Sequence, residues 1–144
     1  MFYIDSNTYI YFDKNASQTL TSKLLSIDSA NIKIPSMVVA ELRLGVEKSA
    51  RREFNSERLE RFLSLYEIIP FDDDATKCYA KIRAELERSG KIIGANDLVI
   101  AATVLSKDGT LVTRNTGEYS RIAELKLENW YDEVAPKKAI VEST

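Results

Sequence analysis

Short apolar runs alternate with stretches of helical spacing along this chain of 144 residues. The apolar runs predict five strands, at 1–4, 31–34, 66–71, 110–113 and 126–130. Between the strands, apolar residues recur every three or four positions, which predicts helices at 16–26, 36–46 and 72–89, a helical hairpin at 47–65, and a helix beginning at Asp97. This alternation predicts an α/β fold with a mostly parallel sheet and helices on both faces.

Oxygen-bearing side chains mark where the predicted helices begin, because they can accept hydrogen bonds from the first-turn amides. Asn7 or Thr8 is predicted to cap the helix after the first strand, and Ser36 the helix after the second. The densest acidic run, 72–74, has a structural explanation as a helix cap and solvated turn.

Four acids stand where a strand ends or a helix begins beside that end: Asp5, Glu41, Asp97 and Glu118, with Asn115 next to the last. In an open α/β sheet, ligands bind outside the carboxyl ends of the strands. Each acid alone could serve a helix N-terminus, whose dipole favours negative charge. Two carboxylates about 4 Å apart repel by roughly 4 kcal/mol at an effective dielectric of 20. Acids gathered at one edge would therefore have raised pKa values or move apart, unless a cation neutralised them. Oxygen ligands without His or Cys select Mg²⁺ or Mn²⁺.

Composition narrows the chemistry further. The chain has no histidine, which excludes His-based zinc sites, Ser-His-Asp and Cys-His nucleophile systems, and two-histidine RNA cleavage. The lone Cys78 cannot form an internal disulfide, which is typical of a reducing cytoplasm. We expect no signal peptide and no membrane span, one domain at 1–135 and a polar tail at 136–144.

A basic cluster follows Glu41 in the sequence. The net charge is −2, so a nucleic-acid partner would need a local basic surface. The cluster is a candidate phosphate-binding edge, and a solvated helix face is an equal alternative for such a mixed-charge stretch. The candidate RNA-binding residues are Arg43, Lys48, Arg51 and Arg52, with Arg114 added beside Asn115.

Four segments resemble the motifs of PIN-domain ribonucleases and, more narrowly, of the VapC toxins of toxin–antitoxin pairs. They are 5–8 (DSNT), 39–42 (VAEL), 93–97 (IGAND) and 111–119 (LVTRNTGEY), in family-like order and spacing from residue 1 to about 130. The resemblance implies an α/β/α sandwich, a homodimer, and an Mg²⁺- or Mn²⁺-dependent endoribonuclease that cuts tRNA or rRNA loops. It also implies a cognate VapB-like antitoxin.

The resemblance assigns roles to individual residues. Asp5, Glu41 and Asp97 match the three acids that hold the metal, and Glu118 is an additional ligand candidate. Asn115 stands where the family often has Asp, so the number of bound metals, one or two, stays open. Thr113 matches a polar residue that supports the water network, with Asn7 and Thr8 as further support.

Two alternatives come from other classes of protein. One is a PIN-like protein that binds RNA or antitoxin without turnover, which the Asn115 departure favours. The other is an aspartyl-phosphate phosphatase of the haloacid dehalogenase type, whose Asp-x-Asp-x-Thr motif resembles 5–8. In that motif Asn7 replaces the second acid. Cation titration separates the first alternative from an enzyme, and a phosphatase assay tests the second.

Overall fold

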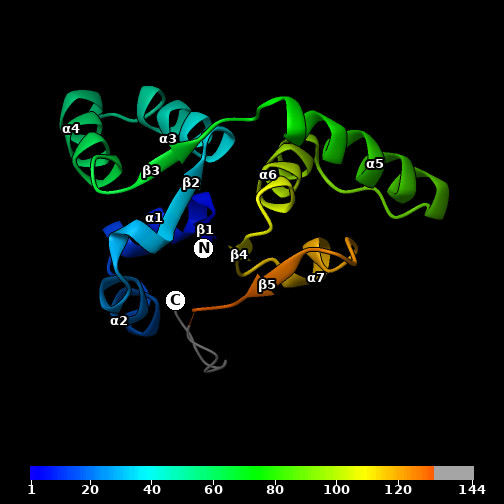
Figure 1. Ribbon diagram of the computed structural model, residues 1–144. Coiled ribbons are helices and arrows are strands. Elements are labelled where there is room, and N and C mark those ends of the chain that lie inside the picture. The colour runs from blue at the N-terminus through cyan, green and yellow to red at the C-terminus, as the bar shows by residue number, and fades with distance from the viewer. Residues whose placement is uncertain (132–144) are drawn as a thin grey trace.

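The computed structural model describes residues 1–131 and is built on a five-stranded sheet (Figure 1). The strands are β1 (Phe2–Ile4), β2 (Ile32–Pro35), β3 (Glu67–Ile69), β4 (Thr110–Val112) and β5 (Lys126–Glu128). Their order across the sheet is β3-β2-β1-β4-β5, and every neighbouring pair is parallel. All five predicted strands are confirmed, each within a few residues of its expected bounds.

Helices fill the connections between successive strands. They are α1 (Ser6–Asp13), α2 (Gln18–Ser26), the 3₁₀ turn η1 (Ser29–Asn31), α3 (Ser36–Glu47), α4 (Arg52–Leu63), α5 (Asp73–Ser89), α6 (Ala95–Ser106) and α7 (Thr116–Tyr119). Figure 1 shows α1 to α4 around the β1–β2–β3 half, and α5 to α7 around the β4–β5 half. Right-handed crossovers that run in opposite directions from β1 place helices on both faces of the sheet. The predicted α/β/α sandwich is confirmed.

Two predicted helix caps are wrong by one to three residues. Asp5, not Asn7 or Thr8, caps α1: its carboxylate accepts a hydrogen bond from the Thr8 amide at 3.0 Å. α3 already begins at Ser36, and Pro35 precedes it without a side-chain cap. The fixed φ of proline suits the entry to a helix, so Ser36 is not needed as a cap.

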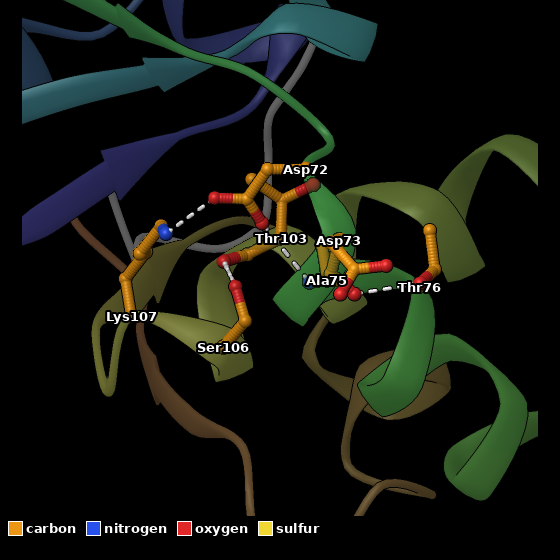
Figure 2. A network of polar contacts seen from close by, with 7 residues as sticks. All are labelled: Asp72, Asp73, Ala75, Thr76, Thr103, Ser106 and Lys107. Carbon is orange, nitrogen blue, oxygen red and sulfur yellow. Dashed lines mark hydrogen bonds and ion pairs between the residues drawn. The ribbon is translucent and has the colours of Figure 1, made fainter.

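The acidic run at 72–74 is confirmed as a helix cap (Figure 2). Asp72 accepts a hydrogen bond from the Ala75 amide at 3.0 Å and forms an ion pair with Lys107 at 2.7 Å. Lys107 first, and then the Ala75 amide, lower the pKa of Asp72. At its other end, α5 closes on Gly90, whose φ of 71° is the left-handed conformation that glycine adopts most easily.

The apolar core lies between the sheet and its helices. Ile4, Ile34 and Val112 from the three central strands are at most 1% exposed, and α6 alone contributes Leu98, Ile100, Ala101, Ala102 and Val104. α6 is buried on almost every side, which is typical of a helix packed inside a domain.

The stretch 47–65 was predicted to form a hairpin of two helices on the surface, and the structure differs from that prediction. This stretch holds the end of α3, a turn and the single helix α4. The inner face of α4 is buried, because Phe62 packs against the rings of Tyr9 and Phe12 in α1. Phe54 and Leu65 remain 45% and 60% exposed, so only part of this stretch offers apolar surface.

Two further expectations concern the limits of the chain. Among residues 1–131, no helix has the length and apolar character needed to cross a membrane. The end of the predicted domain at 132–135 and the predicted tail 136–144 lie outside the described residues.

Candidate active site

Strand register places Asp5 and Thr113 side by side. Ile4 of β1 is paired with Val112 of β4, so the next residue of each strand leaves the sheet at the same carboxyl edge. The strand order reverses at this point, because β1 leads to β2 on one side and lies beside β4 on the other. In doubly wound sheets this reversal is where ligands bind.

Asp5 is a buried carboxylate held by several donors. Its side chain is 7% exposed. Oδ1 accepts hydrogen bonds from the Thr8 amide at 3.0 Å, the Thr8 hydroxyl at 2.9 Å and the Tyr131 hydroxyl at 3.2 Å. Burial raises the pKa of Asp5, and the hydrogen bonds from Thr113, Thr8 and Tyr131 oppose that rise. The predicted support residues Thr8 and Thr113 therefore contact the site, whereas Asn7 is exposed on the first turn of α1.

Glu41 connects two segments of the site. The Ser6 hydroxyl donates to Glu41 Oε1 at 2.8 Å, and the Asn96 amide donates to Oε2 at 3.4 Å. Ser6 follows Asp5 in the chain, and Asn96 precedes Asp97. α3 therefore positions Glu41 between the acids that begin α1 and α6.

Asp97 lies among other carboxylates. Burial raises its pKa to about 6, and Glu118 and Glu41 add to the rise, while the Tyr119 hydroxyl opposes it through a 3.0 Å hydrogen bond to Oδ1. Burial, followed by the Asp97 charge, raises the pKa of Tyr119, so its hydroxyl remains a donor. Asp5 and Glu41 add smaller increases to the pKa of Tyr119. Hydrogen bonds thus link Glu41 to the chain neighbours of Asp5 and Asp97, and a single metal site built from the three acids stays a prediction.

Glu118 and Asn115 come from the short helix after β4. Asn115 Nδ2 donates to Glu118 Oε1 at 2.8 Å, and the Asn115 amide nitrogen donates to Thr113 Oγ1 at 2.9 Å. Asn115 therefore fixes one oxygen of the acid that faces Asp97.

The oxygen atoms of this site are of the chemical types that bind a hard divalent cation. They are carboxylate, amide and hydroxyl oxygens, which suit Mg²⁺ or Mn²⁺. The raised pKa of Asp97 reflects burial and carboxylates whose charges repel one another. Within residues 1–131, no three acidic or thiol side chains are close enough together to form a complete metal site. The carboxylates are thus neighbours held by hydroxyl groups rather than a preformed cage.

The predicted RNA-binding residues separate into two places. The cluster after Glu41 lies on α3, α4 and the turn between them, where Arg43 pairs with Glu60 at 3.0 Å and Arg51 stacks over Phe54 at 4.1 Å. Arg52 lies 4.0 Å from Glu47, and Lys48 is the C-cap of α3. Arg114 instead lies beside the acidic site, against Tyr11 and Tyr131.

Arg114 lies against two aromatic rings. Its guanidinium is 5.2 Å from the ring centre of Tyr11 and 5.6 Å from that of Tyr131. It also donates a hydrogen bond to the Tyr11 hydroxyl. Tyr131 donates a hydrogen bond to Asp5, so a single side chain, that of Tyr131, separates Arg114 from this carboxylate.

Sequence reasoning missed four residues that contact the acids: Ser6, Asn96, Tyr119 and Tyr131. Ser6 and Asn96 are direct neighbours of predicted site residues, so their position in the chain was an available signal. Tyr131 lies 126 residues from Asp5, and no local pattern connects the two.

The fold and the acidic site together define a class of protein. The family model described as "PIN domain" matches residues 2–125, and the chain belongs to the PIN-domain family. Ribonuclease VapC2 of Rickettsia felis is 41% identical over 131 residues, which cover 90% of this chain and 98% of that protein. The tRNA(fMet)-specific endonuclease VapC of Salmonella typhimurium is 33% identical over 90% of this chain and 97% of its own length.

Solved structures give the same assignment. VapBC2 from Rickettsia felis, bound to a DNA fragment from its promoter, matches with a TM-score of 0.84 and 41% identity, covering 90% of this chain and 99% of that one. DNA-bound VapBC from Salmonella typhimurium matches with a TM-score of 0.84, 33% identity, and coverage of 90% and 97%. Within its family the chain is therefore a VapC homologue. This assignment removes the haloacid dehalogenase alternative.

Proposed function

We propose that this protein is a VapC-type endoribonuclease, the toxin of a toxin–antitoxin pair, and that it requires Mg²⁺ or Mn²⁺. The observation that carries the proposal is the hydrogen bonding of Glu41 to Ser6 and Asn96, the chain neighbours of Asp5 and Asp97, beside the carboxyl edge between β1 and β4. The similarity to ribonuclease VapC2 along nearly the whole chain supports the reaction type.

In this proposal Asp5, Glu41 and Asp97 hold the cation, with Glu118 as an additional ligand. A divalent cation bound there supplies an activated water and neutralises charge on the scissile phosphate. Asn115 orients Glu118 through its 2.8 Å hydrogen bond, and Thr8 and Thr113 orient Asp5. Attack by water rather than by the ribose hydroxyl leaves 5′-phosphate and 3′-hydroxyl ends.

The substrate side of the site carries positive charge and aromatic surface. Arg114 is exposed beside Tyr11, a combination suited to phosphate contact and base stacking. The Salmonella relative is named as a tRNA(fMet)-specific endonuclease, so a tRNA or rRNA loop is the proposed substrate class. Lys48, Arg51 and Arg52 form a second candidate surface for the RNA backbone.

Partners follow from the relatives. The two similar solved structures described above are VapBC complexes, so a VapB-like antitoxin is the proposed inhibitor. Apolar side chains on the surface offer contact area for the antitoxin or for a homodimer, namely Leu44, Phe54 and Leu65, at 58%, 45% and 60% exposure. We place this pair in the cytoplasm, where the lone Cys78 remains reduced.

The direct test compares Asp5→Asn with Asp74→Asn on a structured RNA in Mg²⁺ or Mn²⁺. Asp5→Asn is expected to abolish cleavage with the fold retained by circular dichroism. Asp74→Asn is the matched control, because Asp74 is exposed on the first turn of α5. Cleavage by Asp5→Asn at the wild-type rate would falsify the site assignment. Absence of both cleavage and Mn²⁺ binding heat in the wild type would favour the binding-protein alternative.

A further inference from the structure

The C-terminal part of the described chain returns to the first strand. Trp130 packs edge-on against Phe2, with ring centres 5.1 Å apart. Tyr131 is 3% exposed and follows directly. These residues lie beyond the region 2–125 that matches the PIN-domain model, so the family match assigns them no role.

The Tyr131 hydroxyl donates a hydrogen bond to the site carboxylate Asp5. It lies 3.2 Å from Asp5 Oδ1 and 3.0 Å from Thr8 Oγ1. Thr8 has one hydroxyl proton, and it points to Asp5 Oδ1 at 2.9 Å. The three groups form a closed network around one carboxylate oxygen.

The ring of Tyr131 is itself held in place. Tyr11 packs against it edge-on at 5.1 Å between ring centres, and the Arg114 guanidinium lies 5.6 Å from its centre. Tyr11 comes from α1, and Arg114 follows β4, so both neighbours belong to elements that also supply site residues. A ring fixed on two sides gives the hydroxyl a defined direction.

We propose that Tyr131 is a positioning residue for Asp5: its hydroxyl orients the buried carboxylate for the cation and the RNA phosphate. The inference rests on the proposed function, since it assigns Tyr131 to the same site. Groups that orient a metal-binding carboxylate typically change metal affinity or activity about 10- to 100-fold when removed.

Tyr131→Phe tests this because it removes the hydroxyl and keeps the ring that contacts Tyr11. Tyr79→Phe is the matched control: its hydroxyl accepts a hydrogen bond from Arg83 at 2.6 Å on α5. Three quantities are measured for both variants and the wild type: kcat and KM on a fluorescent RNA, Mn²⁺ affinity by calorimetry, and thermal unfolding without metal.

The expected result is a kcat about tenfold lower and an Mn²⁺ affinity about tenfold weaker for Tyr131→Phe, with KM unchanged. Tyr79→Phe should match the wild type in kcat, KM and Mn²⁺ affinity. A lower Tm with unchanged kcat and Mn²⁺ affinity would show a purely structural hydroxyl and overturn the inference, as would a raised KM with normal kcat. In those cases the wild type still cleaves RNA, and the proposed function stands. A wild type that neither cleaves nor binds Mn²⁺ overturns both.

Discussion

Tyr119 donates a hydrogen bond to Asp97 across the site, at 3.0 Å from its hydroxyl to Oδ1. Tyr119 follows Glu118 in α7, and these two neighbours act on Asp97 in opposite directions. Glu118 raises the pKa of Asp97, whereas the Tyr119 hydroxyl lowers it. Burial is the main cause of the raised pKa of Asp97, and the four-residue helix α7 adjusts that pKa in both directions.

Removal of the Tyr119 hydroxyl should raise the pKa of Asp97 above its present value of about 6. Tyr119→Phe loses the hydrogen bond that favours the charged form of Asp97. If the charged carboxylate binds the cation, cleavage near pH 6.5 should fall about 3- to 10-fold, since a hydrogen bond to a charged group is worth about 1 kcal/mol or more. Carboxyl NMR of the metal-free protein measures the pKa directly.

Glu118→Gln is the counterpart of that variant. Because it removes a neighbouring negative charge, the pKa of Asp97 should move down instead of up. Shifts in the same direction for the two variants would contradict the assigned geometry.

The approximate location of the site could be predicted from the sequence because parallel strands end at one edge. Asp5 follows β1 directly, and Thr113 follows β4, so strand prediction alone makes them neighbours. Glu41 and Asp97 could be placed near that edge as residues in the first two turns of the following helices.

What the sequence could not show is the set of hydroxyl groups around the acids. Tyr119 and Tyr131 each carry an apolar ring, and in a sequence they are indistinguishable from core aromatics such as Tyr3. Their roles depend on distances between elements far apart in the chain. The spacing of Leu59, Phe62 and Leu63 predicted a helix, but the sequence could not show which element this apolar face packs against.

Asp72 should affect stability without affecting catalysis. Asp72→Ala removes both the cap on Ala75 and the ion pair with Lys107, so Tm at pH 7 should fall by about 2 to 5 °C. The pKa of Asp72 is lowered in the fold. Its stabilisation is therefore present above the ordinary pKa of 3.8 and is lost as pH falls through the lowered value.

Thermal unfolding at pH 7 and pH 3 tests this dependence, and the difference between Asp72→Ala and wild type should narrow in acid. Cleavage activity should remain at the wild-type level. A loss of cleavage as large as that of Asp5→Asn would place the acidic run in the active site.

Two glycines should respond to alanine in opposite ways. A Cβ at Gly109, in the turn before β4, would lie 2.5 Å from Tyr3 Cδ1, and the Tyr3 ring is buried. Gly109→Ala should therefore destabilise the fold by about 1 to 3 kcal/mol. Gly45 is an exposed position in α3 with nothing within 4 Å of an added Cβ. Gly45→Ala should stabilise the protein by about 0.5 to 1 kcal/mol. Urea denaturation of both variants measures the contrast.

Asp97→Asn should stabilise the metal-free protein at neutral pH while abolishing cleavage. The pKa of Asp97 is about 6 in the fold against an ordinary value of 3.8, so the folded state binds the proton more tightly than the unfolded state. Stability is then highest below pH 4 and declines as pH rises toward 6. The full difference corresponds to about 3 kcal/mol, reduced to about 1 to 2 kcal/mol because Asp97 is partly exposed and solvent screens its charge.

Asparagine carries no charge at any of these pH values, so the variant should escape that decline. In EDTA at pH 7, Asp97→Asn should be about 1 to 2 kcal/mol more stable than the wild type by urea denaturation, and the two should converge near pH 4. Added Mn²⁺ should raise the stability of the wild type more than that of the variant, because the variant lacks one of the carboxylates proposed to hold the cation. A variant less stable than the wild type at pH 7 without metal would show that the Asp97 charge is compensated within the protein, and the requirement for a cation would lose its physical basis.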